Sequence, residues 1–184
     1  MKIQDQKKII RKEIRKLKKD LSLEEKMLLS ELVLKNVEKD ISFINSKTIL
    51  AYWSMKDEVN THSFIIKWSK SKDIYLPVVI GNDLGFRKYS DESELKKDSK
   101  FGIYEPLGAK LNDYSLIDYA IIPGVAFDSN NNRLGRGRAF YDKILNSINA
   151  IKVGICFNFQ FIESVPTEPT DIKMDRVINE TEHQ

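Results

Sequence analysis

Hydrophobic positions at the start of the chain recur with helical spacing. They are separated by three, four or seven residues, and they are Ile3, Ile10, Ile14, Leu17 and Leu21. This pattern predicts an amphipathic helix with one apolar face. A second helix is predicted from Ser22, which has Glu25 three residues later as in a capping box, and from the apolar run over residues 27–40.

Beyond the second helix, short β-rich segments alternate with helical or polar ones. The predicted strands are residues 47–53, 73–79, 84–89, 118–122 and 151–157. Several are apolar throughout, as is typical of parallel strands covered on both faces. Predicted helices lie between them at residues 61–70 and 140–148, and residues 91–100 are predicted as an exposed loop.

This alternation predicts an α/β fold. We expect a three-layer α/β/α sandwich, Rossmann-like, with a mostly parallel, mixed central sheet preceded by the two N-terminal helices. The 184 residues have a mass of 21.3 kDa, which suits one domain over residues 1–184. With 41% hydrophobic and 31% charged residues, the composition excludes collagenous and low-complexity classes.

Targeting and membrane segments are not expected. The longest apolar runs, such as residues 49–53, are far shorter than the roughly 18 residues of a membrane span. The basic N-terminus has no apolar stretch behind it, so we expect no secretory signal and a cytoplasmic protein.

The net charge of +3 is unevenly distributed. Residues 1–20 hold nine basic and three acidic side chains, a local balance of +6, so the other 164 residues sum to −3. A nucleic-acid-binding protein would spread its positive charge over the domain. The alternative is that the basic N-terminal helix binds nucleic acid. The apolar stripe of this helix argues against it, because such a stripe has to pack against a hydrophobic core. Lys7, Arg11, Arg15 and Lys18 lie beside that stripe, where they can turn toward a cleft.

Cysteine and histidine are too scarce for several kinds of site. Cys156 is the one cysteine and lies in the apolar run 153–157, so a buried, inert thiol is favoured over a nucleophile. Since His62 and His183 are the only histidines, a zinc site is not expected.

A glycine- and arginine-rich segment follows the fourth predicted strand and runs into a helix. It contains Arg133, Gly135, Arg136, Gly137 and Arg138. Glycines let the backbone approach a phosphate, and arginines supply charge and paired donors. The carboxyl ends of strands in open α/β sheets are where ligands bind, so this segment could cradle phosphate. The alternative is a solvated turn with exposed arginines.

Acidic and aromatic residues add to this pattern. Asp142, just after the arginines, could hold a magnesium ion bridging nucleotide phosphates, or it could simply complement the helix dipole. Trp53 and Glu58 follow the first strand and could stack on a flat heterocycle and accept its N–H groups, as for a pterin or purine. Alternatively they are an edge aromatic and a solvated acid. Residues 166–171, which include Asp171, form either a further acidic part of the site or a surface turn.

Seven pieces of the chain, taken in order, resemble the 5-formyltetrahydrofolate cyclo-ligase family. They are residues 7–11, Met55-Lys56-Asp57-Glu58, residues 101–106, Pro123-Gly124-Val125-Ala126-Phe127-Asp128, Arg133-Leu134-Gly135-Arg136-Gly137, Tyr141-Asp142 and Pro166-Thr167-Glu168-Pro169. The resemblance implies closure of 5-formyltetrahydrofolate to 5,10-methenyltetrahydrofolate, dependent on ATP and Mg²⁺, with phosphorylation of the formyl oxygen and release of ADP and phosphate. The expected partners are these two small molecules, and we expect a monomer, although the sequence itself does not reveal the oligomeric state.

The resemblance also implies roles for individual residues. The ATP-binding set is Lys7, Lys8, Arg11, Arg133, Leu134, Gly135, Arg136, Gly137, Arg138, Ala139, Phe140 and Tyr141. The folate-binding set is Trp53, Glu58, Arg11, Phe140 and Tyr141. Arg136, Arg138 and Tyr141 would be catalytic, and Asp142 and Asp171 would hold Mg²⁺.

The chain departs from the family at several of these positions. The family's usual Gly-Lys-Gly-Tyr-Tyr-Asp reads Gly137-Arg138-Ala139-Phe140-Tyr141-Asp142 here, and Thr170 replaces a common histidine. Arginine changes the reach and geometry of the phosphate contact. Alanine adds a Cβ, which is unfavourable if the backbone has a positive φ. A diverged paralogue that binds folate or nucleotide without turnover is therefore the alternative to an active enzyme.

Overall fold

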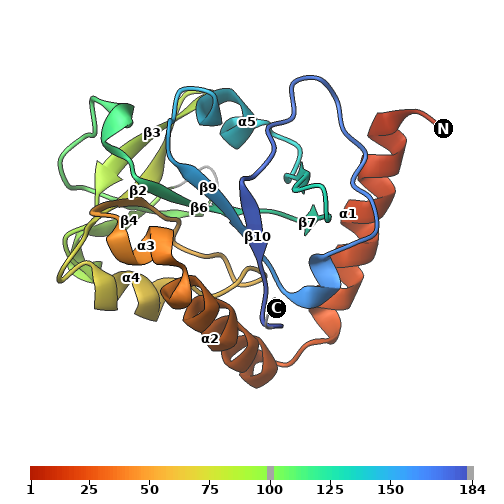
Figure 1. The fold of residues 1–184 in the computed structure, drawn as a ribbon, viewed down its shortest axis with the longest axis horizontal. Coiled ribbons are helices and arrows are strands. Elements are labelled where there is room, and N and C mark those ends of the chain that lie inside the picture. Colours follow the sequence, from red (N-terminus) through yellow and green to blue (C-terminus); the bar gives the residue numbers. More distant parts are fainter. Residues whose placement is uncertain (99–101, 182–184) are drawn as a thin grey trace.

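A six-stranded sheet forms the centre of the computed structural model, which describes residues 1–98 and 102–181 (Figure 1). Its strand order is β10-β9-β6-β1-β2-β3. The strands are β1 (Thr48–Leu50), β2 (Asp73–Ile80), β3 (Asp83–Lys88), β6 (Tyr119–Pro123), β9 (Ile151–Ile155) and β10 (Arg176–Ile178). Neighbouring strands are parallel except for the antiparallel pair β2–β3. The prediction of a mostly parallel, mixed sheet is confirmed.

Helices cover both faces of this sheet (Figure 1). The α-helices of the described residues are α1 (Ile3–Asp20), α2 (Leu23–Lys39), α3 (Ile41–Asn45), α4 (His62–Trp68) and α5 (Phe140–Leu145), and all of them except α1 cover the sheet. Helices α2, α3 and α4 lie on one face and α5 lies on the other. The three-layer α/β/α arrangement and the two leading helices are therefore confirmed. Within the described ranges, no helix is long and apolar enough to cross a membrane.

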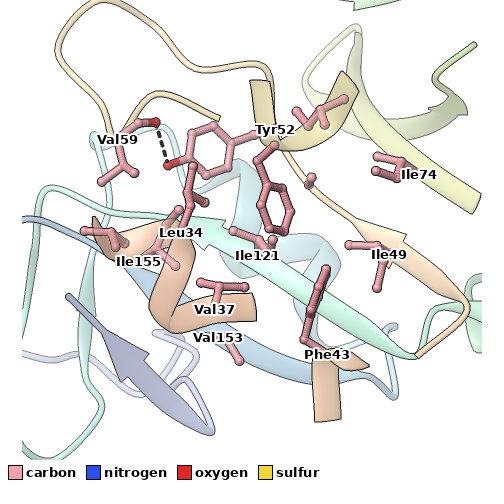
Figure 2. Close-up of a cluster of buried hydrophobic side chains, with 14 of the residues drawn as sticks. Leu34, Val37, Phe43, Ile49, Tyr52, Val59, Ile74, Ile121, Val153 and Ile155 are labelled. Carbon is pink, nitrogen blue, oxygen red and sulfur yellow. Dashed lines mark hydrogen bonds between the residues drawn. The ribbon is translucent and has the colours of Figure 1, made fainter. Parts of the chain in front are cut away.

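Alternation along the strands explains the two layers of core. Successive side chains of a strand point to opposite faces. Ile49 and Ile121 therefore join α2 and α4 in one cluster, whereas Leu50 and Ile122 join Leu145 of α5 in the other. Figure 2 shows the first cluster, where Leu34, Val37 and Phe43 meet side chains from the strands. The Tyr52 hydroxyl there donates to the Val59 carbonyl at 3.5 Å.

Helix α1 lies outside these layers and covers a small hairpin. The hairpin pairs β7 (Ala126–Phe127) with β8 (Arg133–Leu134), and Ile14 of α1 packs on it in a third apolar cluster. The Phe127 ring lies so close to Gly154 of β9 that a Cβ there would collide with it. This contact packs the hairpin against the main sheet. Since α1 packs on the hairpin, the contact also sets the position of α1.

Element boundaries show where the sequence pattern was insufficient. The first strand ends at Leu50, so the prediction of 47–53 was too long. The Ala51 N–H still donates to the Tyr75 carbonyl of β2 at 2.9 Å, and residues 52 and 53 stay buried outside the strand. The helix predicted at 140–148 ends at Leu145.

Other elements were not predicted. The loop predicted at 91–100 contains β4 (Leu95–Lys97), which pairs with β5 (Tyr104–Pro106), and its last two residues lie outside the described ranges. Strands β4, β5 and β10 have three residues each, too few to display an alternation.

Candidate functional site

A cavity of about 270 Å³ lies at the carboxyl ends of β1 and β6. These neighbouring strands mark the point where the strand order reverses: β2 follows on one side of β1, whereas β9 follows on the other side of β6. The helices between those pairs, α4 and α5, cover opposite faces of the sheet. Such a switch point leaves a crevice between the two connections, which is where open α/β sheets bind ligands.

The cavity has an apolar side and a charged side. The apolar side comes from the strands and β5, with Tyr52, Met55, Pro77, Val79, Leu84, Ile103, Tyr104 and Pro123. The charged residues of the lining are Glu58, Glu105, Arg133, Arg136, Arg138 and Asp142, and of these Glu105 comes from β5. Of the predicted site residues, Trp53, Gly135, Ala139, Phe140 and Tyr141 also line the cavity. An apolar wall facing a few fixed charges suits a flat organic ligand joined to an anionic one.

Arg133 is a buried residue of the charged side, and it contacts Pro123 and Asp142. Its guanidinium is almost fully buried, donates to the Pro123 carbonyl at 3.2 Å and pairs with Asp142 Oδ1 at 2.7 Å. It also lies 5.6 Å from the centre of the Tyr141 ring. Burial raises the pKa of the Tyr141 hydroxyl above its ordinary value, so this group stays protonated. Arg133 therefore orients Asp142 and Tyr141 more than it presents charge to the cavity.

The loop that follows Arg133 is exposed and has an unusual backbone. Residues 136–139 are exposed, and Gly137 has a φ of +100°. Ala139 has a φ of +53° and stands directly before α5. The sequence identified Ala139 as unfavourable at a positive φ, and the structure shows that it has one.

Replacing Ala139 by glycine is expected to stabilise the protein. The left-handed region costs a residue with a Cβ about 1 kcal/mol more than glycine, partly offset by the greater freedom of glycine when unfolded. Ala139→Gly should therefore raise the melting temperature by about 1–2 °C, measured by calorimetry. Gly137→Ala is the matched control: its Cβ would meet ordinary contacts 3.6 Å from Arg11, so it should lower the melting temperature by backbone strain alone. An unchanged melting temperature in both variants would contradict this account.

Arg136 bridges to the loop that follows β1. Its Nε and Nη2 donate to Glu58 Oε1 at 3.2 and 3.0 Å, and Nη2 also donates to Asp57 Oδ1 at 2.7 Å. The Glu58 side chain is only 8% exposed, and its Oε2 accepts from the Met55 backbone N–H at 2.9 Å. The two predicted clusters, far apart in sequence, thus meet at one ion-pair network.

Trp53 lies at the cavity wall with most of its surface covered. Its ring stacks on His62 at 4.0 Å and lies 5.7 Å from the Tyr89 ring. Burial lowers the pKa of His62, which favours its neutral form. Since Trp53 is only 8% exposed, it can offer a ligand an edge rather than an open face. Its role in holding folate stays a prediction.

Helix α1 meets the site through two of its three predicted residues. Arg11 donates from Nε to the Gly135 carbonyl at 2.9 Å. Lys7 is buried and contacts Asp171 Oδ2 at 2.5 Å and Glu168 Oε2 at 3.0 Å. Burial opposes the charge of Lys7, but these two carboxylates raise its pKa above the ordinary value. Lys8 is exposed on α1 and does not line the cavity.

The two predicted magnesium ligands lie on adjoining segments. Asp142 Oδ1 is 3.5 Å from the backbone nitrogen of Ile172, the residue after Asp171. Each carboxylate is paired with a cation, Asp142 with Arg133 and Asp171 with Lys7. In the part of the chain that the structure describes, no three acidic, histidine or cysteine side chains gather as a metal site. Carboxylates suit Mg²⁺, which binds through one or two of them and completes its shell with water and substrate phosphates, so a role of Asp142 and Asp171 in holding Mg²⁺ stays a prediction.

Two further outcomes concern the sequence predictions. Cys156 is fully buried, so its predicted burial is confirmed. Burial raises the pKa of its thiol, which favours the predicted inert form. The apolar wall from β2, β3 and β5 was not predicted as part of the site. Apolar residues in strands signal a core, and nothing local distinguishes those that line a cavity.

Comparison with known proteins extends these observations. A model of the 5-formyltetrahydrofolate cyclo-ligase family matches residues 3–180. The 5-formyltetrahydrofolate cyclo-ligase of Haemophilus influenzae is 33% identical, over 90% of this chain and 92% of its own. The solved 5,10-methenyltetrahydrofolate synthetase of Aquifex aeolicus superposes with a TM-score of 0.86 and 33% identity, covering 96% of this chain and 90% of its own. The corresponding structure from Mycoplasma pneumoniae gives a TM-score of 0.77 at 26% identity, covering 95% and 99%.

Proposed function

The chain belongs to the 5-formyltetrahydrofolate cyclo-ligase family, and we propose that it closes 5-formyltetrahydrofolate to 5,10-methenyltetrahydrofolate at the expense of ATP. The observation that carries this proposal is the cavity at the carboxyl ends of β1 and β6, which is lined by apolar side chains and by the arginine loop with Asp142. A reaction that joins a flat folate to the terminal phosphate of ATP needs both surfaces next to each other.

The proposed reaction has two steps. The formyl oxygen attacks the γ-phosphorus, and the bond from that phosphorus to the bridging oxygen breaks, releasing ADP. N10 of the folate then attacks the activated formyl carbon and gives up its proton. Phosphate departs with the formyl oxygen, leaving the methenyl bridge between N5 and N10.

Phosphoryl transfer of this kind requires positioned positive charge more than covalent work by the protein. In this proposal Arg138 and Arg136 contact the transferring phosphate from the exposed loop over the cavity. Arg11 supports the same loop through the Gly135 carbonyl. Bound Mg²⁺, held by Asp142 and Asp171, would neutralise charge on the phosphates.

The folate would occupy the apolar side of the cavity. Phe140 and Tyr141 supply aromatic surface there, next to the side chains of β2 and β3. Glu58 is a buried carboxylate at the boundary of the two sides, and as an acceptor it suits the N–H groups of a pterin ring. Its orientation is fixed by the Met55 backbone and by Arg136.

A second candidate is a diverged paralogue that binds its ligands without turnover. Ala139 at φ +53° favours it, since this Cβ stands in the loop proposed to meet phosphate. An assay separates the two: purified protein is mixed with 5-formyltetrahydrofolate and MgATP, and the near-ultraviolet absorbance of methenyltetrahydrofolate is followed. Controls omit ATP or add a chelator. Absorbance that requires both ATP and Mg²⁺ supports the enzyme, whereas calorimetric binding of both ligands without absorbance supports the paralogue.

Arg11→Ala is expected to weaken nucleotide binding. The half-buried guanidinium would lose its place beside the loop, and the Gly135 carbonyl would lose one donor. We expect the KM for ATP to rise about tenfold, with a loss of stability of about 1 kcal/mol. Steady-state kinetics and thermal denaturation test this. Arg15→Ala, an exposed arginine on the same helix, serves as control. A lower melting temperature with unchanged KM would make Arg11 purely structural.

A further inference from the structure

A four-membered charge network joins α1, the loop after β1 and the arginine loop. It consists of Lys18, Asp57, Glu58 and Arg136. Lys18 comes from the C-terminal half of α1, Asp57 and Glu58 from the segment after β1, and Arg136 from the loop before α5. Two positive and two negative charges balance within it.

Asp57 occupies the middle of this network. Its Oδ1 accepts from Arg136 Nη2 at 2.7 Å, and its Oδ2 lies 3.7 Å from Lys18 Nζ. Lys18 is only 6% exposed, and burial lowers its pKa against the charge of Asp57. Burial also acts to raise the pKa of Asp57, but the hydrogen bond and charge of Arg136, with the charge of Lys18, hold it below its ordinary value. Asp57 is thus an ionised carboxylate between two cations.

The contacts of Arg136 show what Asp57 contributes. Glu58 accepts from Nε and Nη2, and Asp57 accepts from Nη2, so both carboxylates hold one edge of the guanidinium. The Nη1 donors lie outside this set of contacts. A planar guanidinium fixed along one edge presents its remaining donors in a defined direction.

Arg136 needs two carboxylate partners because one of them, Glu58, is shared with the folate in the proposed reaction. In the proposed reaction Glu58 also accepts from the folate, so it cannot by itself keep Arg136 in place. Asp57 is 44% exposed, more than Glu58, and it does not line the cavity. Its ion pairs with Arg136 and Lys18 are therefore the contacts that remain when a folate engages Glu58.

We propose that Asp57, with buried Lys18 behind it, is a positioning residue that holds Arg136 toward the phosphates of the nucleotide. This inference rests on the proposed function and adds a residue to it. Asp57 acts through Arg136 and touches neither substrate. Its loss should therefore affect nucleotide more than folate.

The test compares Asp57→Asn with Asp73→Asn. Asp73 is a matched control because it is similarly exposed and pairs with Lys88 at 2.6 Å, but at the start of β2, the opposite end of the strand from the cavity. Asp57→Asn should raise the KM for ATP about tenfold, the size expected for one hydrogen bond to a charged group, and change the KM for folate less than twofold. Asp73→Asn should change neither.

A double substitution shows whether Asp57 acts through Arg136. In an Arg136→Ala background, Asp57→Asn should have no further effect on the KM for ATP, since coupled residues are not additive. An equal tenfold effect in that background would overturn the proposal, as would an unchanged KM with a lower melting temperature. If the wild-type protein showed no turnover, the proposed function would fail by itself. Calorimetry with a non-hydrolysable ATP analogue would still test Asp57, with the same tenfold difference expected.

Discussion

Asp142→Asn is expected to reduce turnover by roughly 30- to 1000-fold while leaving the fold intact. The substitution removes the anionic charge proposed to hold Mg²⁺ at the phosphates, and such electrostatic groups contribute about 2–4 kcal/mol each to the transition state. Asparagine keeps nearly the same volume, and its Oδ1 can still accept from buried Arg133. A loss of about 1.5–3 kcal/mol in stability is expected because Arg133 loses a charged partner.

Kinetics and calorimetry together test this result. Asp83→Asn is a suitable control. Asp83 forms an ion pair at 3.2 Å with Lys143, which belongs to the same helix as Asp142. Asp83 is mostly exposed and does not line the cavity. It should retain wild-type turnover. Wild-type turnover of Asp142→Asn at saturating Mg²⁺ would refute the metal role and leave Asp142 as the structural partner of Arg133.

Local signals account for the parts of the fold that the sequence predicted. The capping box at α2 forms as expected, with Ser22 Oγ accepting from the Glu25 N–H at 3.1 Å and Glu25 Oε2 accepting from the Ser22 N–H at 2.8 Å. The helix α1 was equally predictable, but its apolar face is only partly buried: Ile14 is buried, whereas Ile3 and Leu17 are 41% and 45% exposed. Ile14 packs on the β7–β8 hairpin, whose strands have two residues each and give no period.

The site was predictable to the extent that it lies at strand ends. Residues 53–58 and 133–142 follow β1 and β6, and neighbouring parallel strands bring their carboxyl ends together. The pairing of Lys7 with Asp171 spans 164 residues, and that of Arg136 with Glu58 spans 78. Such contacts depend on strand order, which no local pattern in the sequence specifies. For the same reason Lys18 and Asp57 could not be connected to Arg136 from the sequence.

Arg138 is the second residue for which a large effect is expected. It lines the cavity, and the residues on either side of it, Gly137 and Ala139, both have a positive φ. A left-handed backbone on both sides sets the direction in which its side chain leaves the loop. Arginine offers a planar fork where the family usually has the point charge of lysine, so the two are interchangeable only if this backbone has adjusted. Ala139, strained at φ +53°, is the change that would accompany such an adjustment.

Three variants follow from this argument. Arg138→Ala should lower kcat/KM roughly 30- to 1000-fold if the side chain stabilises the transferring charge. This corresponds to a rise of about 2–4 kcal/mol in the activation free energy. Arg138→Lys should cost less, and adding Ala139→Gly should recover part of that loss, because neighbours that share one ligand are coupled. Steady-state kinetics measure all three, with Arg15→Ala as the control for removal of one exposed positive charge. Full activity of Arg138→Ala would mean that residues 136–139 form a solvated turn, and the phosphate would then have to be bound by Arg136 and Arg11 alone.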